Sequence, residues 1–266
     1  MIALLRYEWV RISTVRSSKI CLVLAFVIAA GLAYLIAQPS EIMDSEGTLS
    51  SGPIEWWGAF GYPLTFTAVL ASVVASQAIG QEYRFGLIRL TLTAFPSRSQ
   101  VLVAKIAVSV VGCLALVAAS YLGSLLGVTL RGHPLPPSDV VTPGSAYLLR
   151  GAVFVALWGI SAFALAGLTR QTAIGIAVPI VSGLIVEQIV GAVLRDRAEW
   201  IVKVMPWSTA SRWFQEPVSA DPSAGGGGTG FGLDDLPVGW AALGIFAVWV
   251  AVLVALEVVA FLRRDA

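Results

Sequence analysis

Six long apolar stretches, separated by shorter polar segments, dominate the hydrophobic pattern of this chain. A helix of about 20 apolar residues crosses the hydrocarbon core of a bilayer. The stretches occupy residues 20–37, 57–80, 102–130, 146–168, 173–194 and 238–262. We therefore predict an all-α integral membrane protein with six transmembrane helices. The third stretch is longer than a bilayer needs, so we expect that helix to tilt or to protrude.

Prolines and small residues refine this prediction. Pro63 and Pro179 lie within the second and fifth stretches, where prolines mark kinks that neighbouring helices can tolerate. Gly123 and Gly127 form a G-x-x-x-G pattern in the third stretch, and small residues also recur in the fourth. Such spacing permits close packing of membrane helices, but it does not by itself identify a dimer interface.

The segment before the first apolar stretch, residues 1–19, has an amphipathic pattern. Its apolar positions recur at helical spacing and are Ile2, Leu5, Trp9 and Ile12. Basic helices with tryptophan on the apolar face tend to lie in the membrane interface. We therefore expect an interfacial helix over 1–19, followed by a single transmembrane domain over 20–266. An ordinary cytosolic lead-in is the alternative.

Composition supports a membrane protein. Hydrophobic residues make up 57% of the 266 residues and charged residues 12%, and the mean hydropathy is +0.83. Soluble domains usually carry about twice this charged fraction. The net charge of +1 does not point to nucleic acid. With one histidine, and with both cysteines in apolar runs, the sequence offers no cluster of metal ligands, so we expect no metal site.

The distribution of Lys and Arg predicts the orientation. If both termini are cytoplasmic, 11 of the 17 basic residues lie in cytoplasmic segments and 6 in outer ones. The outer segment 38–56 contains acidic residues but neither Lys nor Arg. Because cytoplasmic loops are enriched in Lys and Arg, we expect both termini in the cytoplasm.

The last outer segment, residues 195–237, is long. Its first half contains Met205-Pro206-Trp207 and Trp213-Phe214, and aromatic residues favour the headgroup level of a membrane. We expect this half to form an interfacial helix on the outer surface. The glycine run 225–228 is typical of a flexible linker.

The cytoplasmic loop 81–101 is the most informative segment. It is rich in charge but not in Gly or Ser, and Glu82 and Arg89 flank a short run of apolar and threonine residues. This pattern predicts a small surface helix. Pro96 is expected to end it before Arg98 and Lys105 lead into the third membrane helix.

This loop resembles the first cytoplasmic loop of permease subunits of type-2 ABC exporters. The shared order is Glu82-Tyr83-Arg84-Phe85-Gly86, then a Leu-containing helix, then Pro-x-Arg, then Ala-Lys at the start of a membrane helix. The sharp resemblance covers residues 81–105, and the six-helix layout extends it. The family often has Gly-Thr where this chain has Gly86-Leu87, which could alter the cap of the loop helix.

The resemblance implies a coupling helix that sits in a cleft of a separate ATP-binding cassette subunit. The residues expected to bind that partner are Glu82, Tyr83, Arg84, Phe85, Gly86, Arg89, Leu90, Pro96 and Arg98. A solvated loop that follows the positive-inside rule is the alternative. The chain has no GxxxxGK[ST] motif, so we expect no enzyme activity or catalytic residues here, with ATP and magnesium on the partner. A second permease copy or a sister permease is also expected.

Polar residues inside the apolar stretches are candidates for a substrate path, because intramembrane polar groups are costly. These candidates are Glu187, Gln188, Gln77 and Arg150. Glu187 could instead pair with Arg150 as a structural contact between helices. Glu257 lies six positions before Arg263, so we expect it to snorkel to the cytoplasmic interface.

The function implied by the resemblance is an exporter permease in the plasma membrane of a bacterial cell. It would move hydrophobic or amphipathic compounds, such as a drug, antibiotic, peptide or lipid, out of the cytoplasm or inner leaflet. The alternatives are a stand-alone membrane transporter and an immunity- or sensor-type binding protein. A neighbouring ATPase gene would favour the exporter over both.

Overall fold

The fold is almost entirely helical and contains the expected membrane spans. The structure, a computed structural model, describes residues 2–36, 39–43, 49–54, 57–95, 97–132, 144–194, 198–215 and 239–263. Within these ranges six helices are long and apolar enough to cross a membrane: Arg16–Ile36, Ala59–Arg84, Arg98–Leu130, Ser145–Thr169, Thr172–Leu194 and Gly239–Arg263. Each coincides with one of the predicted stretches to within a few residues at either end, so the prediction of six spans is confirmed.

The elements of the first half run from the N-terminal helix to the third span. They are α1 (Ile2–Thr14), α2 (Arg16–Ile36), β1 (Pro39–Met43), β2 (Leu49–Ile54), the π-helical turn η1 (Trp57–Gly61), α3 (Tyr62–Arg84), α4 (Ile88–Ala94) and α5 (Arg98–Leu130). The second half contains α7 (Ser145–Thr169), α8 (Thr172–Val181), the π-helical turn η3 (Ser182–Val186), α9 (Glu187–Leu194), α10 (Glu199–Lys203), α11 (Pro206–Gln215) and α12 (Gly239–Arg263).

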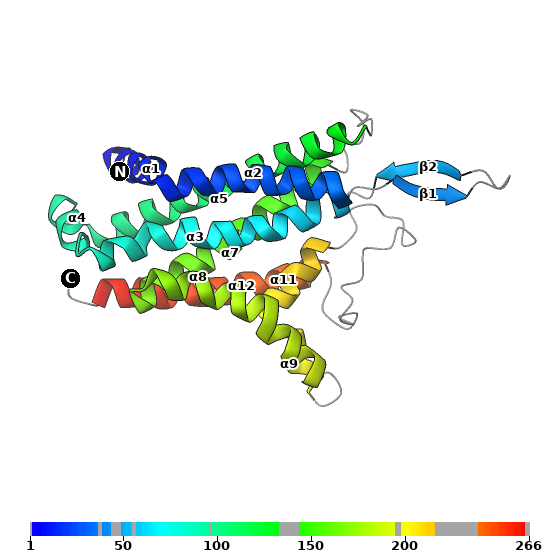
Figure 1. The fold of residues 1–266 in the computed structure, drawn as a ribbon. Helices are drawn as coiled ribbons and strands as arrows, with labels where there is room; N and C mark the ends of the chain where they lie inside the picture. The colour runs from blue at the N-terminus through cyan, green and yellow to red at the C-terminus, as the bar shows by residue number, and fades with distance from the viewer. Residues whose placement is uncertain are drawn as a thin grey trace.

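The two ends of the bundle differ. The N-terminus, the C-terminus and α4 lie at one end, and the β1–β2 hairpin extends from the other (Figure 1). Helix α1 lies across the bundle at the first of these ends, roughly perpendicular to the spans. An even number of spans places both termini on one side of the membrane, which is the side we expect to be cytoplasmic.

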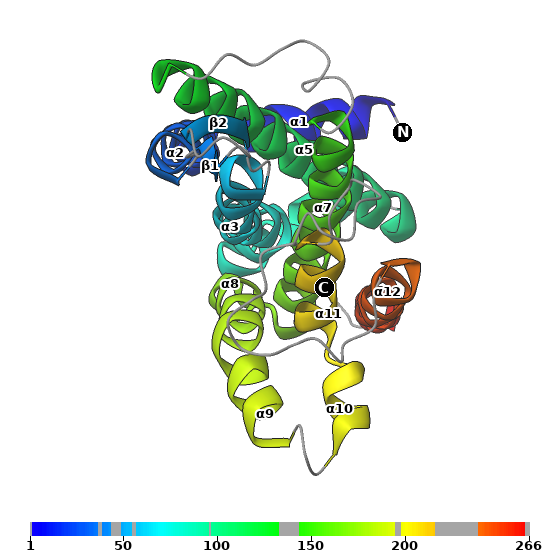
Figure 2. The same cartoon turned by 90° about the vertical axis from the view of Figure 1, so that its right-hand side faces the viewer.

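Helices α3 and α7 form the centre of the bundle. Viewed along the spans, α2 and α5 lie to one side of this pair, and α8, α11 and α12 to the other (Figure 2). The buried face of α3 is rich in small residues, including Ala71, Ala75 and Ala78, and α7 presents Gly159 and Ala162. Small side chains let helix backbones approach closely, which is how membrane helices gain packing energy.

The G-x-x-x-G pattern of α5 packs against α2 of the same chain. A Cβ atom on Gly123 would overlap the backbone oxygen of Phe26, and one on Gly127 would overlap that of Ala30. The expectation of close helix packing at these glycines is therefore confirmed. The contact is intramolecular, which accounts for the pattern without a second copy of the chain.

The β1–β2 hairpin is the one departure from an all-α fold in the part of the chain described. Its strands are antiparallel, with Pro39 opposite Ile54 and Met43 opposite Leu49. Our prediction of an exclusively helical chain is wrong for this outer segment. A short connection between two spans has to satisfy its backbone groups, and pairing two strands does so locally.

The two prolines act differently from each other. Pro179 lies inside α8, and the π-helical turn η3 begins three residues later, at Ser182. The fifth span is therefore interrupted, and α9 diverges from the bundle (Figure 1). Pro63 lies in the first turn of α3, directly after the π-helical turn η1, at a position where a missing N–H is well tolerated. A kink at Pro63 stays a prediction.

Candidate functional site

The loop between α3 and α5 forms the small helix predicted from the sequence. Helix α3 ends at Arg84, the chain turns through Phe85, Gly86 and Leu87, and α4 then runs from Ile88 to Ala94. Gly86 has φ of +67°, a left-handed conformation that glycine adopts at little cost. Pro96, expected to end this helix, lies outside the described residues.

One face of α4 holds the loop against the bundle. Ile88 and Thr91 are buried, and Leu92 and Phe95 pack against the main hydrophobic core. The phenyl ring of Phe95 also lies 6.2 Å from the ring of Tyr7 on α1. Burial of these apolar groups gives α4 a defined position, which a solvated loop would not have.

The opposite face of α4 and its preceding turn exposes apolar side chains between two arginines. We call this set, Arg84, Phe85, Leu87, Arg89 and Leu90, the α4 surface. Phe85 is 65% exposed and Leu90 67%, and the Arg84 guanidinium lies 5.6 Å from the centre of the Phe85 ring. Clustered apolar side chains outside the membrane spans, flanked by cations, are characteristic of a protein-binding surface.

Two residues predicted to bind the partner also connect the loop to neighbouring helices. The Arg170 guanidinium lies 5.3 Å from the ring centre of Tyr83, and Arg170 itself caps α7 with φ of +57°. The Arg98 guanidinium donates to the backbone oxygens of Phe261 and Leu262 at the end of α12, at 3.5 and 3.4 Å. Cations favour the carbonyl end of a helix, so Arg98 stabilises that end.

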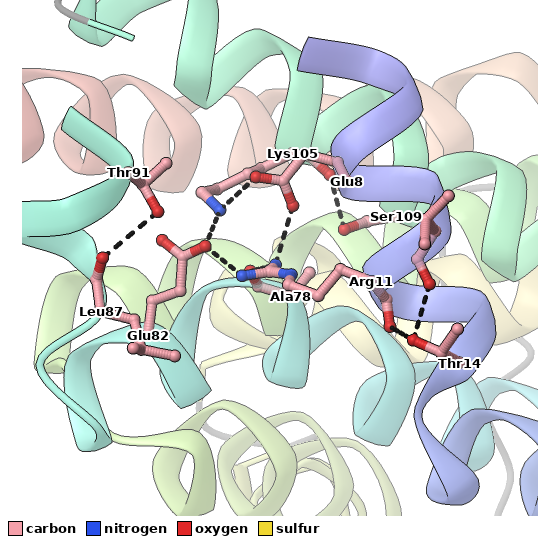
Figure 3. Close-up of polar contacts among 10 residues, drawn as sticks. Glu8, Arg11, Thr14, Ala78, Glu82, Leu87, Thr91, Lys105 and Ser109 are labelled. Carbon is pink, nitrogen blue, oxygen red and sulfur yellow. Dashed lines mark hydrogen bonds and ion pairs between the residues drawn. The ribbon is translucent and has the colours of Figure 1, made fainter. Parts of the chain in front are cut away.

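Glu82, also predicted to bind the partner, lies inside the protein. The structure brings its carboxylate into a cluster with Glu8, Arg11 and Lys105 (Figure 3). The Lys105 ammonium lies 2.5 Å from Glu82 Oε1 and 2.6 Å from Glu8 Oε1. The Arg11 guanidinium pairs with Glu82 and lies 2.9 Å from Glu8 Oε2, and it also donates to the backbone oxygen of Ala78. In this arrangement the Glu82 carboxylate is therefore not available for direct contact with a partner.

The buried cluster joins three elements. Glu8 and Arg11 come from α1, Glu82 from the end of α3 and Lys105 from α5. Two carboxylates face two cations, so the cluster is formally neutral. Charges removed from water are tolerated only when they are paired, and loss of one partner then costs far more than a surface pair would.

Glu8 was not among the residues singled out from the sequence. On α1, Leu4, Glu8 and Ile12 recur every four residues and are buried, whereas Ile2 and Trp9 of the predicted stripe are exposed. The interfacial position expected for this helix stays a prediction. A single acidic residue within an apolar i, i+4 row, together with Lys105 inside an apolar span, could have indicated a buried pair.

Among the predicted substrate-path residues, two have defined structural contacts. The Gln77 side-chain oxygen accepts a 2.6 Å hydrogen bond from the hydroxyl of Ser17, which joins α3 to α2. Glu187 caps α11. Its Oε2 accepts from the amide and hydroxyl of Ser208 at 2.6 and 2.7 Å, and its Oε1 accepts from the Trp207 amide at 3.3 Å.

These hydrogen bonds explain why position 187 holds an acidic residue. The first amide groups of a helix lack intrahelical acceptors and carry partial positive charge, so a carboxylate there is stabilised. The carboxylate makes these contacts and forms no ion pair with Arg150, contrary to the alternative raised above. A role in the substrate path stays a prediction for all four residues, Glu187, Gln188, Gln77 and Arg150.

Replacing Glu187 with glutamine is expected to loosen α11. One acceptor oxygen and the charge are lost, so we expect a loss of about 1–2 kcal/mol in stability. Thermal unfolding in detergent would measure it. Gln188→Ala is the matched control, because the side-chain oxygen of Gln188 has no hydrogen-bond partner among the described residues. Unchanged stability in Glu187→Gln with altered transport would instead support the substrate-path role.

One other expectation is wrong. Glu257 is buried, and its carboxylate lies against Gly167 of α7, so it does not snorkel toward water.

Helix α11, in the segment expected to be interfacial, packs on α7 and α12, and its position relative to the headgroups stays a prediction. Trp213 and Phe214 are buried, and the Phe214 ring stacks on that of Phe154 at 5.1 Å. The glycine run 225–228 lies outside the described residues.

The fold and the site together define a polytopic membrane protein that presents a small helix at the end of the bundle where its termini lie. A family model described as ABC-2 family transporter protein matches residues 2–266. The chain therefore belongs to the ABC-2 transporter family, which confirms the resemblance to type-2 ABC permeases. Members are the membrane components of these transporters and are not themselves catalytic, and membership implies pairing with an ATP-binding cassette subunit. A comparison with individual curated proteins gives no significant match.

Proposed function

We propose that this chain is the permease subunit of an ATP-driven exporter. Its cargo is a hydrophobic or amphipathic compound, of the class that includes drugs, antibiotics, peptides and lipids. The chain moves this cargo out of the cytoplasm or the inner leaflet, and ATP and magnesium bind to a separate ATPase subunit. The location is the plasma membrane of a bacterial cell, with both termini in the cytoplasm.

The observation that carries this proposal is the α4 surface. Its apolar side chains are exposed at the end of the bundle where the termini lie, although the opposite face of α4 is anchored in the core. A pocket on the ATPase can bury Phe85 and Leu90, while Arg84 and Arg89 pair with acidic groups at its rim.

The buried cluster supports a route from this surface to the spans. Glu82 lies two residues before Arg84, and its carboxylate is paired with Lys105 of α5 and with α1. Movement of α4 by the ATPase then displaces the ends of α3 and α5 together with α1, because moving these helices apart would leave the buried charges of the cluster unpaired. Two permeases and two ATPase subunits complete the transporter, the second permease being another copy or a sister chain.

The test is co-purification with the ATP-binding cassette subunit encoded beside this chain, after co-expression in mild detergent. Phe85→Ala combined with Leu90→Ala removes the two most exposed apolar groups of the α4 surface. We expect the affinity for the ATPase to fall at least about tenfold, since interface anchors are worth about 2 kcal/mol or more each. The fold should survive, because neither side chain is buried.

The matched control is Phe66→Ala combined with Leu130→Ala. Phe66 is 50% exposed and Leu130, at the other end of α5, is 68% exposed. This control should bind the ATPase like the unmodified chain. Equal loss in both variants would show that the α4 surface is not the docking site. If a well-folded chain binds no ATPase at all, the exporter function fails and a stand-alone transporter or binding protein takes its place.

A further inference from the structure

The loop that carries the α4 surface is connected to the bundle in two directions, through consecutive residues of α3. The side chain of Glu82 points to α1 and α5, where its carboxylate joins the buried cluster. The ring of Tyr83 meets α7 and α8 instead, because the guanidinium of Arg170 lies 5.3 Å from its centre. Viewed along the spans, α5 and α8 lie on opposite sides of the α3–α7 pair (Figure 2). Each half of the chain therefore has its own contact with the loop.

Tyr83 belongs to the turn that presents the α4 surface. Its backbone oxygen accepts a 3.3 Å hydrogen bond from the amide of Gly86, and the oxygen of Glu82 accepts one of 2.9 Å from the amide of Leu87. The Tyr83 side chain is half-buried and packs against the main hydrophobic core. A displacement of α4 therefore displaces Tyr83 as well.

Arg170 occupies a position in the turn between α7 and α8 that glycine would fill at lower cost. Its amide donates to the oxygen of Gly167 at 3.3 Å, and the amide of Gln171 donates to the oxygen of Ala166 at 3.2 Å, which are the two hydrogen bonds of a Schellman cap. The residue at this point of the cap has a positive φ and is usually glycine. Among the described residues Arg170 is the one non-glycine residue with a positive φ, +57°. A side chain kept in a conformation that costs energy indicates a requirement for that side chain.

The turn is also fixed against α3. A Cβ atom on Gly80 would lie 2.5 Å from the hydroxyl oxygen of Thr172, which is the first residue of α8. Helix α8 therefore begins in close contact with the last turns of α3, two residues after Arg170. From there it leads through η3 into α9, where Glu187 caps α11. A movement of the turn has a direct path to the outer part of the chain.

We propose that Arg170 is a positioning residue that couples the loop to the fourth and fifth spans. When the ATPase displaces α4, Tyr83 moves with it, and the guanidinium stacked on its ring carries that movement into the turn between α7 and α8. The buried cluster around Glu82 connects the loop to α1 and α5, so the loop moves both halves of the chain. This inference rests on the proposed function, because it concerns the movement that an ATPase imposes on α4.

The experiment follows each half of the chain with a fluorescent reporter. Leu122→Cys on α5 and Leu184→Cys on η3 place single labels at exposed positions, and the native Cys21 and Cys113 are buried. Each bimane-labelled chain is reconstituted in vesicles of phosphatidylethanolamine and phosphatidylglycerol, together with the ATP-binding cassette subunit encoded beside it. Emission is compared before and after addition of ATP, magnesium and vanadate. We expect both reporters to respond when position 170 is arginine.

Arg170→Gly is the main variant, because glycine adopts a positive φ without strain. Its unfolding temperature should not fall, and its affinity for the ATPase should be unchanged, since Arg170 is not part of the α4 surface. We expect the response at position 184 to fall about threefold, the effect of losing one exposed cation–π contact, while the response at position 122 persists. Arg170→Lys keeps a cation beside the ring and should restore most of the response.

Variants of Tyr83 test the same contact from its other side. Tyr83→Leu should reproduce the loss at position 184, whereas Tyr83→Phe keeps the ring and should respond like the unmodified chain. Combining Tyr83→Leu with Arg170→Gly should add no further loss, because both changes remove one contact.

An undiminished response of Arg170→Gly at position 184 would overturn the inference and leave the exporter function intact. The backbone contact of Gly80 with Thr172 would then carry the movement. A loss at both reporters together with a lower unfolding temperature would also overturn it, since Arg170 would then only stabilise the fold. If the unmodified chain binds no ATPase, or if neither reporter responds to ATP, the proposed function fails and this inference fails with it.

Discussion

Replacing Lys105 with methionine is expected to destabilise the folded chain by about 3–5 kcal/mol, the cost of breaking a buried ion pair from one side. The ammonium of Lys105 lies within 2.6 Å of carboxylate oxygens from both Glu8 and Glu82. Methionine preserves the volume of the side chain but removes the charge. Two buried carboxylates would then face Arg11 alone.

Thermal unfolding of the purified chain in detergent measures this loss, and Arg6→Met is the control. Arg6 is exposed on α1, so that variant removes a cation without burying an unpaired anion. Combining Lys105→Met with Glu8→Gln should recover part of the stability, because the second change restores neutrality. If Lys105→Met unfolds at the same temperature as the control, the ion cluster does not form in the folded chain.

This prediction also determines how variants of the loop should be interpreted. Glu82→Ala would remove a carboxylate from the buried cluster, and its effect on ATPase binding would arise through the fold. Arg84 is exposed on the α4 surface and lacks that complication. A loss of binding on substitution of Glu82 therefore does not identify a docking residue, whereas a loss on substitution of Phe85 and Leu90 does.

The second large effect is expected from Gly127→Leu. A Cβ atom at this position would overlap the backbone oxygen of Ala30 and would lie 2.9 Å from the amide nitrogen of Tyr34. Backbone atoms of a helix cannot rotate away as a side chain can, so α2 and α5 would have to separate. Overpacking costs about 1–3 kcal/mol and occasionally more, and α2–α5 is the most extensive helix pair in the described structure.

Gly31→Leu on α2 is the matched control, because a Cβ atom at Gly31 has nothing within 4 Å. We expect Gly127→Leu to reduce the yield of monodisperse protein and its unfolding temperature, while Gly31→Leu leaves both nearly unchanged. Equal behaviour of the two variants would mean that α2 and α5 do not approach as closely as the structure places them.

Part of the candidate site followed from local sequence. The charged residues around a short apolar run, the glycine at 86 and the resemblance of the loop were enough to predict α4 as a small helix between two spans. The sequence did not show which residues face outward, because a seven-residue helix with apolar groups on both sides has no clear amphipathic pattern. Contact with the core, through Ile88 and Phe95, decides that Phe85 and Leu90 remain exposed.

The number, length and order of the spans follow from the sequence alone, because a helix is the simplest way to satisfy every backbone group in lipid, and hydropathy reports its length. Only the tertiary structure decided which polar residues meet. Glu8 and Lys105 are 97 positions apart, and Glu187 lies 21 positions before Ser208. Pairing at such separations depends on how helices pack and rotate against one another. The hydrophobic pattern of one helix does not predict which residues of other helices will lie beside it.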